Sequence, residues 1–417
     1  MIDCATLGEV ADVVSGVGFP KVLQGNANGE VPVFKVGDIS SAFKSGSRYL
    51  RRSPNHLSHE SARQLAAKLM PAGTIVFAKI GEGLKLNRRA VLAQPSLVDN
   101  NVMGLIPKAD YIASSYLYYF MQTVDLGKLS RATAVPSVRR SDVVALSVPL
   151  PSLLEQEGIV SEIEKQFSRL DGAVANLQRV KANLKRYKAS VLKDAVEGRL
   201  APANAIASDG EGCAVWVPLS RTIKTLDQGW SPQCESKSRS SSDEWAVIKT
   251  TAIQPMEFQS EENKLLPLGL MPRANLGLMN GDLLITRAGP RTRVGVTSLV
   301  KSDRPRLMLC DKAYRLRAKL DVAIPAFLEV ALNSPALLDR LDELKSGISD
   351  SGVNLTQRRF GELLVPLPSL AEQQRIVDEV DRRLSLARVV ESEVDANIKK
   401  ARALQNALLT KVFGGKE

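Results

Sequence analysis

Basic side chains that could bind phosphate groups are concentrated in a few short stretches of the sequence. Residues 287–319 carry ten arginines and lysines against only Asp303 and Asp311, a local charge of +8. Looser groups occur between residues 44 and 52 and between residues 79 and 89. Arginine and lysine on loops neutralise phosphates, and in a major groove they bind the edge of guanine. The chemistry indicated is therefore recognition of a polyanion, and for each single residue the alternative is a solvated basic surface.

Several basic residues are candidates for such contacts. They come from these clusters and from two similar strand-like runs at residues 33–36 and 247–250: Lys35, Lys79, Lys85, Arg88, Arg89, Lys249, Arg287, Arg291 and Arg293. Because the clustering carries the signal rather than any single residue, the sequence predicts a binding surface and not a catalytic group.

The sequence contains no recognisable catalytic motif. It lacks the G-x-x-x-x-G-K-[ST] phosphate loop, the Asn-Pro-Pro-aromatic run of amino-methyltransferases and a Gly-rich cofactor turn after a strand. His56 and His59 form an H-x-x-H pair without a third ligand, and we interpret them as flanking a helix start capped by Ser58. The four cysteines are scattered without a C-x-x-C pair, which argues against a zinc site and fits a reducing compartment. We therefore expect no catalytic residue, no metal and no directly bound cofactor.

The composition is that of an ordinary globular protein with a basic excess. The 417 residues are 44% hydrophobic and 24% charged, and the net charge is +11. This length indicates roughly two to four domains, and the positive charge makes nucleic acid the expected partner. No apolar run approaches the ~20 residues of a membrane span, and the N-terminus does not resemble a signal peptide. We expect a cytoplasmic protein without a membrane partner.

The chain contains one segment twice, at an offset of 217 residues. Residues 148–160 read VPLPSLLEQEGIV and residues 365–377 read VPLPSLAEQQRIV, with ten of thirteen positions identical. The register continues without a gap to residues 200 and 417. Weaker echoes precede each copy, such as Gly18-Phe19-Pro20 and Gly229-Trp230-Ser231-Pro232. An internal duplication follows, with a variable domain before each alike segment: domain 1–147, segment 148–200, domain 201–364 and segment 365–417.

Each alike segment is predicted to form one long helix. The Pro-Leu-Pro start forbids helix, and Ser152-x-x-Glu155 and Ser369-x-x-Glu372 then provide capping boxes. Apolar residues follow at a mean spacing of 3.5, typical of a coiled-coil seam, with some irregular three-residue steps. The two stripes most simply bury each other between antiparallel helices; the alternative is that each packs on its own domain. The expected seam residues are Phe167, Leu170, Val174, Leu177, Leu184 and Val191 in the first helix and Leu384, Ala387, Val394, Ile398 and Leu408 in the second.

The two variable domains alternate strand-like and helix-like runs. Helices are predicted at residues 61–69, 114–122 and 325–332, and strands at residues 31–36, 74–78, 143–148, 247–250, 282–286 and 295–300. The predicted fold class is therefore α+β: two mixed domains joined by two long helices that form an antiparallel coiled coil, with a pseudo-twofold internal repeat.

This arrangement resembles the specificity (S) subunit of type I restriction-modification systems. The resemblance rests on residues 7–10, 16–20, 33–39, 149–159, 188–200 and 366–376. It implies that the variable domains are target-recognition domains, each of which reads one half of a split sequence in double-stranded DNA. It also implies two methyltransferase (modification) subunits as partners, and restriction/translocase subunits in the full complex. S-adenosylmethionine, ATP and Mg are then expected on the partner subunits and not on this chain.

Two other functions stay open at the level of the sequence. One is a self-sufficient bipartite DNA-binding regulator, and the other is a metal-dependent nuclease that uses an unrecognised acidic cluster. Binding of a methyltransferase partner separates the specificity subunit from the regulator, and metal-dependent cleavage by the isolated chain would identify the nuclease. The bases read and the length of the gap do not follow from the sequence.

Overall fold

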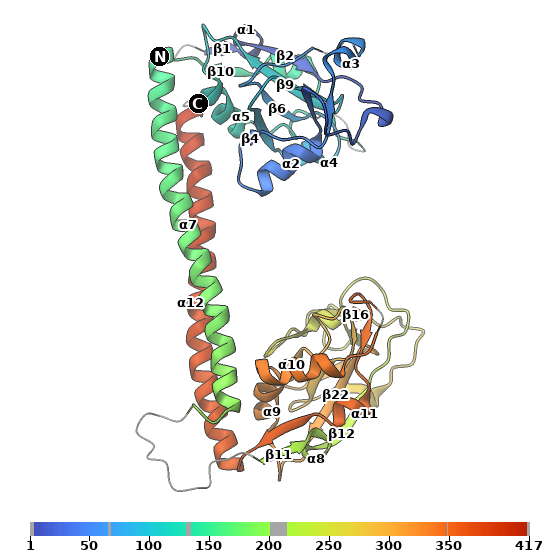
Figure 1. Cartoon of the computed structure of the whole chain (residues 1–417). Helices are drawn as coiled ribbons and strands as arrows, with labels where there is room; N and C mark the ends of the chain where they lie inside the picture. Colours follow the sequence, from blue (N-terminus) through green and yellow to red (C-terminus); the bar gives the residue numbers. More distant parts are fainter. Residues whose placement is uncertain (1–3, 66–67, 131–134, 201–214, 348, 415–417) are drawn as a thin grey trace. The chain divides into compact units, whose positions relative to one another are not determined.

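The computed structural model of the chain describes residues 4–65, 68–130, 135–200, 215–347 and 349–414. They form two compact units: Met1–Leu177 with Ala396–Glu417 (unit 1), and Gln178–Asp395 (unit 2). Each unit consists of one mixed domain and a part of each long helix (Figure 1). Because the units share the helices, they do not test the boundaries at residues 147, 200 and 364, which stay predictions.

Unit 1 is built on a five-stranded sheet in the order β2-β9-β6-β7-β4. Neighbouring strands are antiparallel except β4 and β7, which are parallel. Helix α5 (Ser114–Thr123) packs on this sheet, since Tyr116 and Leu117 belong to the same buried cluster as Phe77. The strand bounds are β2 Ala11–Ser15, β4 Tyr49–Leu50, β6 Ile75–Ala78, β7 Arg89–Leu92 and β9 Val102–Pro107.

A second sheet of unit 1 has the order β5-β3-β8. Strand β3 (Val31–Phe34) is antiparallel to β5 (His56–Leu57) and parallel to β8 (Leu97–Val98). All residues of β3 are buried, as in a strand covered on both faces. The short helices of this unit are α1 Leu7–Val10, η1 Lys21–Leu23, α2 Val36–Lys44, α3 His59–Gln64, α4 Glu82–Lys85 and α6 Arg140–Val144.

Unit 2 repeats this plan with sheets of order β12-β22-β18-β20 and β16-β13-β21-β17. Strand β13 (Ala246–Ile248) is antiparallel to β16 (Asn263–Leu265) and parallel to β21 (Arg304–Met308), which is the pattern of β3 in unit 1. The duplication therefore extends to the topology of the variable domains. The other bounds are α8 Leu219–Thr222, β12 Ile223–Gln228, η2 Thr250–Ala252, β14 Ile253–Gln254, β15 Glu257–Phe258, η3 Ala274–Leu276, β17 Gly277–Leu278, β18 Leu283–Thr286, β19 Ala288–Gly289, β20 Thr297–Leu299, β22 Ala313–Ala318, α9 Pro325–Leu332, α10 Pro335–Leu344, β23 Val353–Asn354 and α11 Gln357–Gly361.

Most predicted elements of the domains are present. The strands predicted near residues 31, 74, 247, 282 and 295 are β3, β6, β13, β18 and β20, and the last two predicted helices are α5 and α9. The strand predicted at residues 143–148 was wrong in its first part, because α6 includes Val143 and only β10 (Ser147–Pro149) is extended. Val143 is fully buried in unit 1, so packing outweighs the strand preference of two adjacent valines.

The histidine pair flanks a helix start, as predicted. His59 is the first residue of α3, and the Ser58 hydroxyl accepts a hydrogen bond from the Ser61 N–H at 3.1 Å. Helix α3 covers residues 59–64 rather than 61–69, and residues 66 and 67 lie outside the described part of the chain.

Two helices of 44 residues each, α7 (Leu153–Val196) and α12 (Leu370–Phe413), follow the duplicated motif. Short antiparallel ribbons precede them: β1 (Cys4–Thr6) pairs with β10, and β11 (Val215–Pro218) pairs with β24 (Leu364–Leu367). The capping box of α7 is present, since the Ser152 N–H donates to Glu155 at 2.9 Å and the Glu155 N–H donates to Ser152 Oγ at 3.4 Å.

The second capping box is only half retained. The Glu372 N–H donates to Ser369 Oγ at 3.3 Å, but the Glu372 carboxylate accepts from Arg375 Nε at 2.7 Å. Arg375 replaces Gly158 of the first copy. One of the three differences in the repeat therefore redirects this carboxylate.

The two long helices run antiparallel where they contact. In unit 2, Lys181 pairs with Asp395 and Lys188 with Glu391, so residue numbers rise along one helix as they fall along the other. In unit 1, Gln405 donates to Asp171 at 2.8 Å.

The apolar stripe is covered unevenly. All eleven residues that were predicted for the seam are buried or half-buried. The helix ends also pack on the domains: Val191 and Leu384 share a buried cluster with Phe327 of α9. Other apolar residues that continue the same spacing are exposed, because the irregular steps turn them away from the partner helix; they are Val180, Tyr187, Val390 and Leu404.

A buried glutamine fixes the start of α7. Gln156 is fully buried, and its Nε2 donates to the carbonyl oxygens of Tyr111 and Pro151, both at 2.9 Å. Its Oε1 accepts from the Ala113 N–H at 2.8 Å. One amide side chain thus ties the first turn of the helix to the loop that precedes α5.

Gln373 makes the same three contacts at the start of α12. Its Nε2 donates to Val322 O at 3.1 Å and to Pro368 O at 2.9 Å, and its Oε1 accepts from the Ile324 N–H at 2.8 Å. Gln373 is also fully buried. The identical Pro-x-x-x-x-Gln spacing of the two copies therefore has a structural reason.

Replacement of either glutamine should destabilise the unit that contains it. In Gln373→Ala, one buried N–H and two carbonyls lose their partner, which costs about 1–3 kcal/mol. The adjacent Gln374→Ala is the matched control, because Gln374 is exposed and contacts only Asp378, so we expect a change within about 0.5 kcal/mol. Urea unfolding of both variants measures the difference, and equal stabilities would contradict the role of the glutamine.

Candidate nucleic-acid interface

Each unit has a cluster of loops where the parallel strands of its second sheet end. In unit 1, Lys35 follows β3 and Asp99 follows β8; in unit 2, Lys249 follows β13 and the loop at residues 309–312 follows β21. Because parallel strands end at the same edge, the loops after them meet there, and in open α/β sheets ligands bind at this edge. We call these places junction 1 (residues 35, 79 and 99–101) and junction 2 (residues 249, 287 and 310–312).

Backbone hydrogen bonds establish that the two junctions correspond. The N–H of Lys79, directly after β6, donates to Asn101 O at 2.9 Å, and the N–H of Arg287, directly after β18, donates to Lys312 O at 2.9 Å. Lys79 and Arg287 therefore occupy equivalent positions, as do Asn101 and Lys312.

A glycine lies against each junction. A β-carbon at Gly16 would lie 2.0 Å from Asp99 O, and one at Gly229 would lie 2.3 Å from Cys310 O, so no side chain fits at either position. Gly16 is thus the counterpart of Gly229, and the pairing of Gly18 with Gly229 from the sequence was wrong. Gly18 has no neighbouring atom within 4 Å of such a β-carbon.

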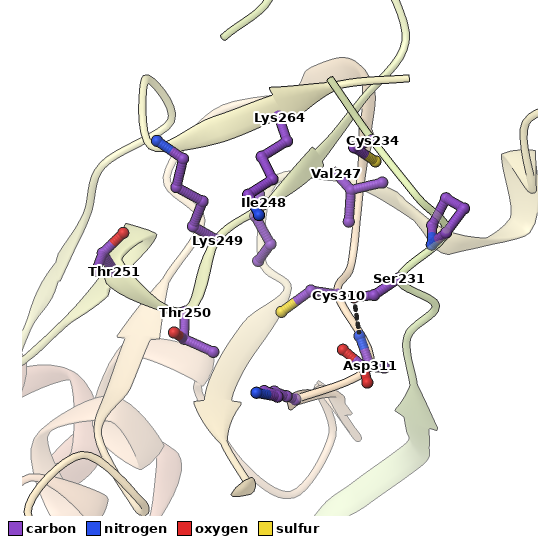
Figure 2. Close-up of a pocket in the computed structure, with 12 residues that line it drawn as sticks. Ser231, Cys234, Val247, Ile248, Lys249, Thr250, Thr251, Lys264, Cys310 and Asp311 are labelled. Carbon is purple, nitrogen blue, oxygen red and sulfur yellow. Dashed lines mark hydrogen bonds between the residues drawn. The ribbon is translucent and has the colours of Figure 1, made fainter. Parts of the chain in front are cut away.

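Junction 2 contains a pocket of about 490 Å³ (Figure 2). Three ammonium groups and one carboxylate line it, those of Lys249, Lys264, Lys312 and Asp311. Lys249 is 3.5 Å from Glu262. Burial raises the pKa of the Cys310 thiol, which also lines the pocket, to about 12, so this thiol is uncharged at neutral pH. The pocket is basic and suits an anionic or acceptor-rich ligand.

Two of the candidates predicted in this domain converge on junction 2. Lys249 lines the pocket, and Arg287 Nε donates to Asp311 O at 2.7 Å. Arg293 does not line the pocket; it donates to Thr250 O at 2.9 Å, to Ile253 O at 2.8 Å and to Gln254 Oε1 at 3.1 Å. The fourth candidate, Arg291, does not join them either: it pairs with Asp342 at 2.5 Å, and this hydrogen bond raises the pKa of Arg291.

Two candidates of the first domain lie at junction 1. Lys35 is half-buried, and its Nζ donates to Gln24 Oε1 at 2.7 Å. Lys79 is half-buried after β6. Burial raises the pKa of Asp99 in the same junction, against the opposing effect of hydrogen bonds from Asn101. Junction 1 has two lysines beside Asp99, whereas junction 2 has three basic residues beside Asp311, so junction 1 has fewer basic groups.

The remaining candidates of the first domain lie on and after α4 and differ in exposure. Lys85 is exposed with Glu82 at 3.4 Å, and the Arg88 guanidinium lies 5.0 Å from the centre of the Phe43 ring. Arg89 is only 3% exposed; it donates to Asn87 O at 2.5 Å and to Val124 O, and burial lowers its pKa to about 10. The contacts of Arg89 are thus internal to the unit.

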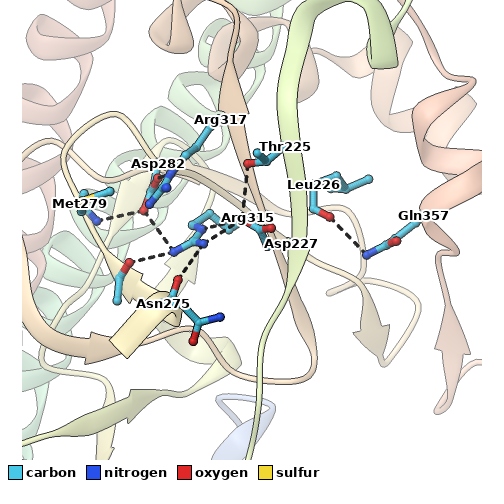
Figure 3. Close-up of polar contacts among 10 residues, drawn as sticks. Thr225, Leu226, Asp227, Asn275, Met279, Asp282, Arg315, Arg317 and Gln357 are labelled. Atoms are coloured by element: carbon cyan, nitrogen blue, oxygen red, sulfur yellow. Dashed lines mark hydrogen bonds and ion pairs between the residues drawn. The ribbon is translucent and has the colours of Figure 1, made fainter. Parts of the chain in front are cut away.

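The basic stretch at residues 287–319 is partly neutralised inside unit 2 (Figure 3). Arg315 is 3% exposed and lies between Asp227, at 2.8 Å, and Asp282, at 3.9 Å. Arg317 pairs with the same Asp282 at 2.7 Å. The local charge of +8 in the sequence therefore overstates the charge available to a ligand.

The sequence placed Asp311 and Lys312 in the basic stretch, but it did not single out Asn100, Asn101, Lys264 or the buried glutamines. Asn100 and Asn101 are uncharged, and Lys264 is distant in sequence from the basic stretch. A search for clusters of basic residues therefore does not identify them. The identity of Gln156 and Gln373 across the repeat was a signal that pointed to them.

The chain contains two topologically equivalent domains, and their equivalent junctions carry unlike side chains. This is the arrangement of a duplicated recognition protein rather than of an enzyme with one active site. Within the described residues, no group of three histidine, cysteine or acidic side chains could hold a metal ion. None of the helices described is both long and apolar enough to cross a membrane.

Comparison with known proteins finds similarity to type I restriction-modification specificity subunits. Residues 3–186 match the model of the type I restriction modification DNA specificity domain. The specificity subunit of the type I restriction enzyme EcoEI of Escherichia coli is 36% identical over 166 residues, which are 40% of this chain and 28% of that protein. That of EcoBI, also from Escherichia coli, is 21% identical in an alignment of 436 positions that covers 98% of this chain and 85% of that one.

Solved structures agree in fold along nearly the whole chain. One is a chain from a study of complex assembly and conformational transition of the type I R-M system, with a TM-score of 0.70, 17% identity and coverage of 98% of this chain and 96% of that one. The other is the HsdS subunit from Thermoanaerobacter tengcongensis, with a TM-score of 0.54, 18% identity and coverage of 99% and 96%. The predicted α+β fold with two long helices is confirmed. Residues 3–186 thus match the type I restriction modification DNA specificity domain, and the whole chain is similar to specificity subunits of type I restriction enzymes.

The close approach at the junctions predicts that Gly16 and Gly18 differ in their tolerance of a side chain. Gly16→Ala forces its β-carbon against a backbone carbonyl, and we expect a loss of about 1–3 kcal/mol in the stability of unit 1. Gly18→Ala is the control and should change stability by less than about 0.5 kcal/mol. Thermal unfolding measures both changes. If the Gly16→Ala protein is as stable as the control, Gly16 is not the position equivalent to Gly229.

Proposed function

We propose that this chain is the DNA-recognition subunit of a type I restriction-modification complex and that it reads a bipartite, asymmetric site in double-stranded DNA. The observation that supports this most directly is the pair of equivalent junctions with different side chains. Because donors and acceptors differ between the two domains, the two half-sites should differ in sequence. None of the comparisons supports the self-sufficient regulator.

The basic residues at the junctions would position the DNA. Lys35 and Lys79 beside junction 1, and Lys249 and Arg287 beside junction 2, would contact phosphates, which fix register without reading sequence. Lys85 and Arg88 would extend the same surface. The internal contacts of Arg89 and Arg293 and the ion pair of Arg291 support a structural role for these three residues instead.

The chemistry would reside on partner subunits. We propose two methyltransferase subunits as partners, with restriction/translocase subunits in the full complex, and S-adenosylmethionine, ATP and Mg bound by them. Similarity to specificity subunits of type I restriction enzymes supports this, as does the type I R-M system to which the structural relative belongs. We place the protein in the cytoplasm as part of the same proposal.

Mapping of N6-methyladenine tests the proposed function. The full chain is combined with the modification subunit that co-purifies with it, and random-sequence DNA is methylated and sequenced. We expect methylation in one recurring pattern of two unlike sequences separated by a constant gap. Methylation of a single uninterrupted sequence, or failure of any methyltransferase to co-purify, would contradict the proposal.

The two long helices would set the gap between the half-sites. Both units share them, and their register is marked by the Lys181–Asp395 ion pair. Deletion of residues 178–184 together with residues 393–399 removes one heptad from each helix. At 1.5 Å per residue this shortens the pair by about 10 Å, or about three base pairs at 3.4 Å each.

We expect the shortened protein to methylate the same two half-sites at a smaller gap. The same mapping experiment reads the result. An unchanged gap with unchanged half-sites would show that the helices do not determine the spacing.

A further inference from the structure

The two junctions differ most at the tip of one loop. This loop joins β8 to β9 in unit 1 and β21 to β22 in unit 2, and the residues directly before the second strand are Asn100-Asn101 and Asp311-Lys312. The backbone bonds from Lys79 and Arg287 fix this correspondence residue by residue. The same backbone position therefore presents two amides in one unit and a carboxylate with an ammonium in the other.

These side chains face solvent or a pocket. Asn100, Asn101 and Lys312 are exposed, and Asp311 is half-buried. Asp311 and Lys312 both line the pocket of junction 2. Among the described residues, neither the Asp311 carboxylate nor the Lys312 ammonium has a hydrogen-bond or ion-pair partner. The Asp311 and Lys312 side chains are therefore available to an incoming ligand, whereas the Asn101 side chain also makes a hydrogen bond to Asp99.

The two tips match different base pairs in a major groove. A G·C pair presents the O6 and N7 acceptors of guanine beside the N4 donor of cytosine, which suits a lysine next to an aspartate. An A·T pair presents the N7 acceptor and N6 donor of adenine, and the amide of asparagine pairs with both. Both tips carry zero net charge, so exchanging them leaves the net charge of each junction unchanged while the hydrogen-bonding pattern changes.

We infer that these dipeptides determine specificity: Asn100-Asn101 selects an A·T pair in one half-site, and Asp311-Lys312 selects a G·C pair in the other. The inference rests on the proposed function. The flanking cations support it, because Lys35 and Lys79 at one tip and Lys249 and Arg287 at the other would hold the backbone of the DNA while the tip contacts a base edge.

Exchange of the tips tests the inference. Asn100→Asp with Asn101→Lys gives junction 1 the tip of junction 2, and Asp311→Asn with Lys312→Asn makes the reciprocal change; neither alters the net charge. Duplexes bound by the full chain, in complex with its modification subunit, are selected from a randomised pool and sequenced. Each exchange should change the ratio of affinities for G·C and A·T at one position of one half-site by about 5- to 150-fold. The preference at the other half-site should stay the same.

The outcomes are distinguishable. If the wild-type complex selects no bipartite sequence, the proposed function fails and the inference fails with it. If the wild-type complex selects one but both exchanged proteins select the same sequence, the inference alone is overturned. Thermal unfolding shows whether each variant is folded. If one exchanged protein is unfolded, the sequence selected by the other exchanged protein tests the inference.

A control separates base readout from a general effect of the substitutions. Asn176→Asp with Asn397→Lys makes the same chemical change at exposed positions of the long helices, away from both junctions. We expect this protein to select the wild-type sequence with unchanged preference. A loss of selectivity equal to that of the exchanged tips would also overturn the inference.

Discussion

The amide of one buried glutamine in each unit ties the first turn of its long helix to the mixed domain. A helix start that packs against a domain must satisfy backbone groups that water no longer reaches. Gln156 does so for the loop before α5 and Gln373 for the loop before α9, each with one accepted and two donated hydrogen bonds. The motif is present in both copies although the domains around it differ in sequence, and in both copies the glutamine makes the same three contacts.

The two mixed domains share their topology and their packing at equivalent positions, although most of their residues differ. Gly16 and Gly229 allow the same close approach of two chain segments. Equivalent positions on α5 and α9 carry Tyr116 and Phe327, which are both fully buried. Loops that follow the strands have no such constraint, so their side chains are free to change, and function in rigid scaffolds is commonly carried by such loops. The junctions are an instance of this division.

The sequence was sufficient to predict the duplication, the two capped helices and the α+β class, because these depend on local periodicity and on comparison of the chain with itself. The junctions were not predictable, since they are assembled by pairing strands far apart in sequence, such as β3 with β8. Exposure was also not predictable from clustering: Lys85 and Arg89 lie in one basic group, yet Lys85 is exposed and Arg89 is buried. Arg315 and Asp227 show the same limit, because their ion pair joins β22 to β12.

Net charge in such a protein is therefore a poor measure of its binding surface. The guanidinium of Arg315 is buried with two carboxylates, and removal of one partner would leave an uncompensated charge in the interior. Loss of DNA binding after neutralising arginines of the basic stretch would then report a damaged fold as readily as a lost contact. Substitutions that preserve charge and lie on exposed loop tips avoid this ambiguity, because they alter the donors and acceptors presented to a base without disturbing the buried ion pairs beneath.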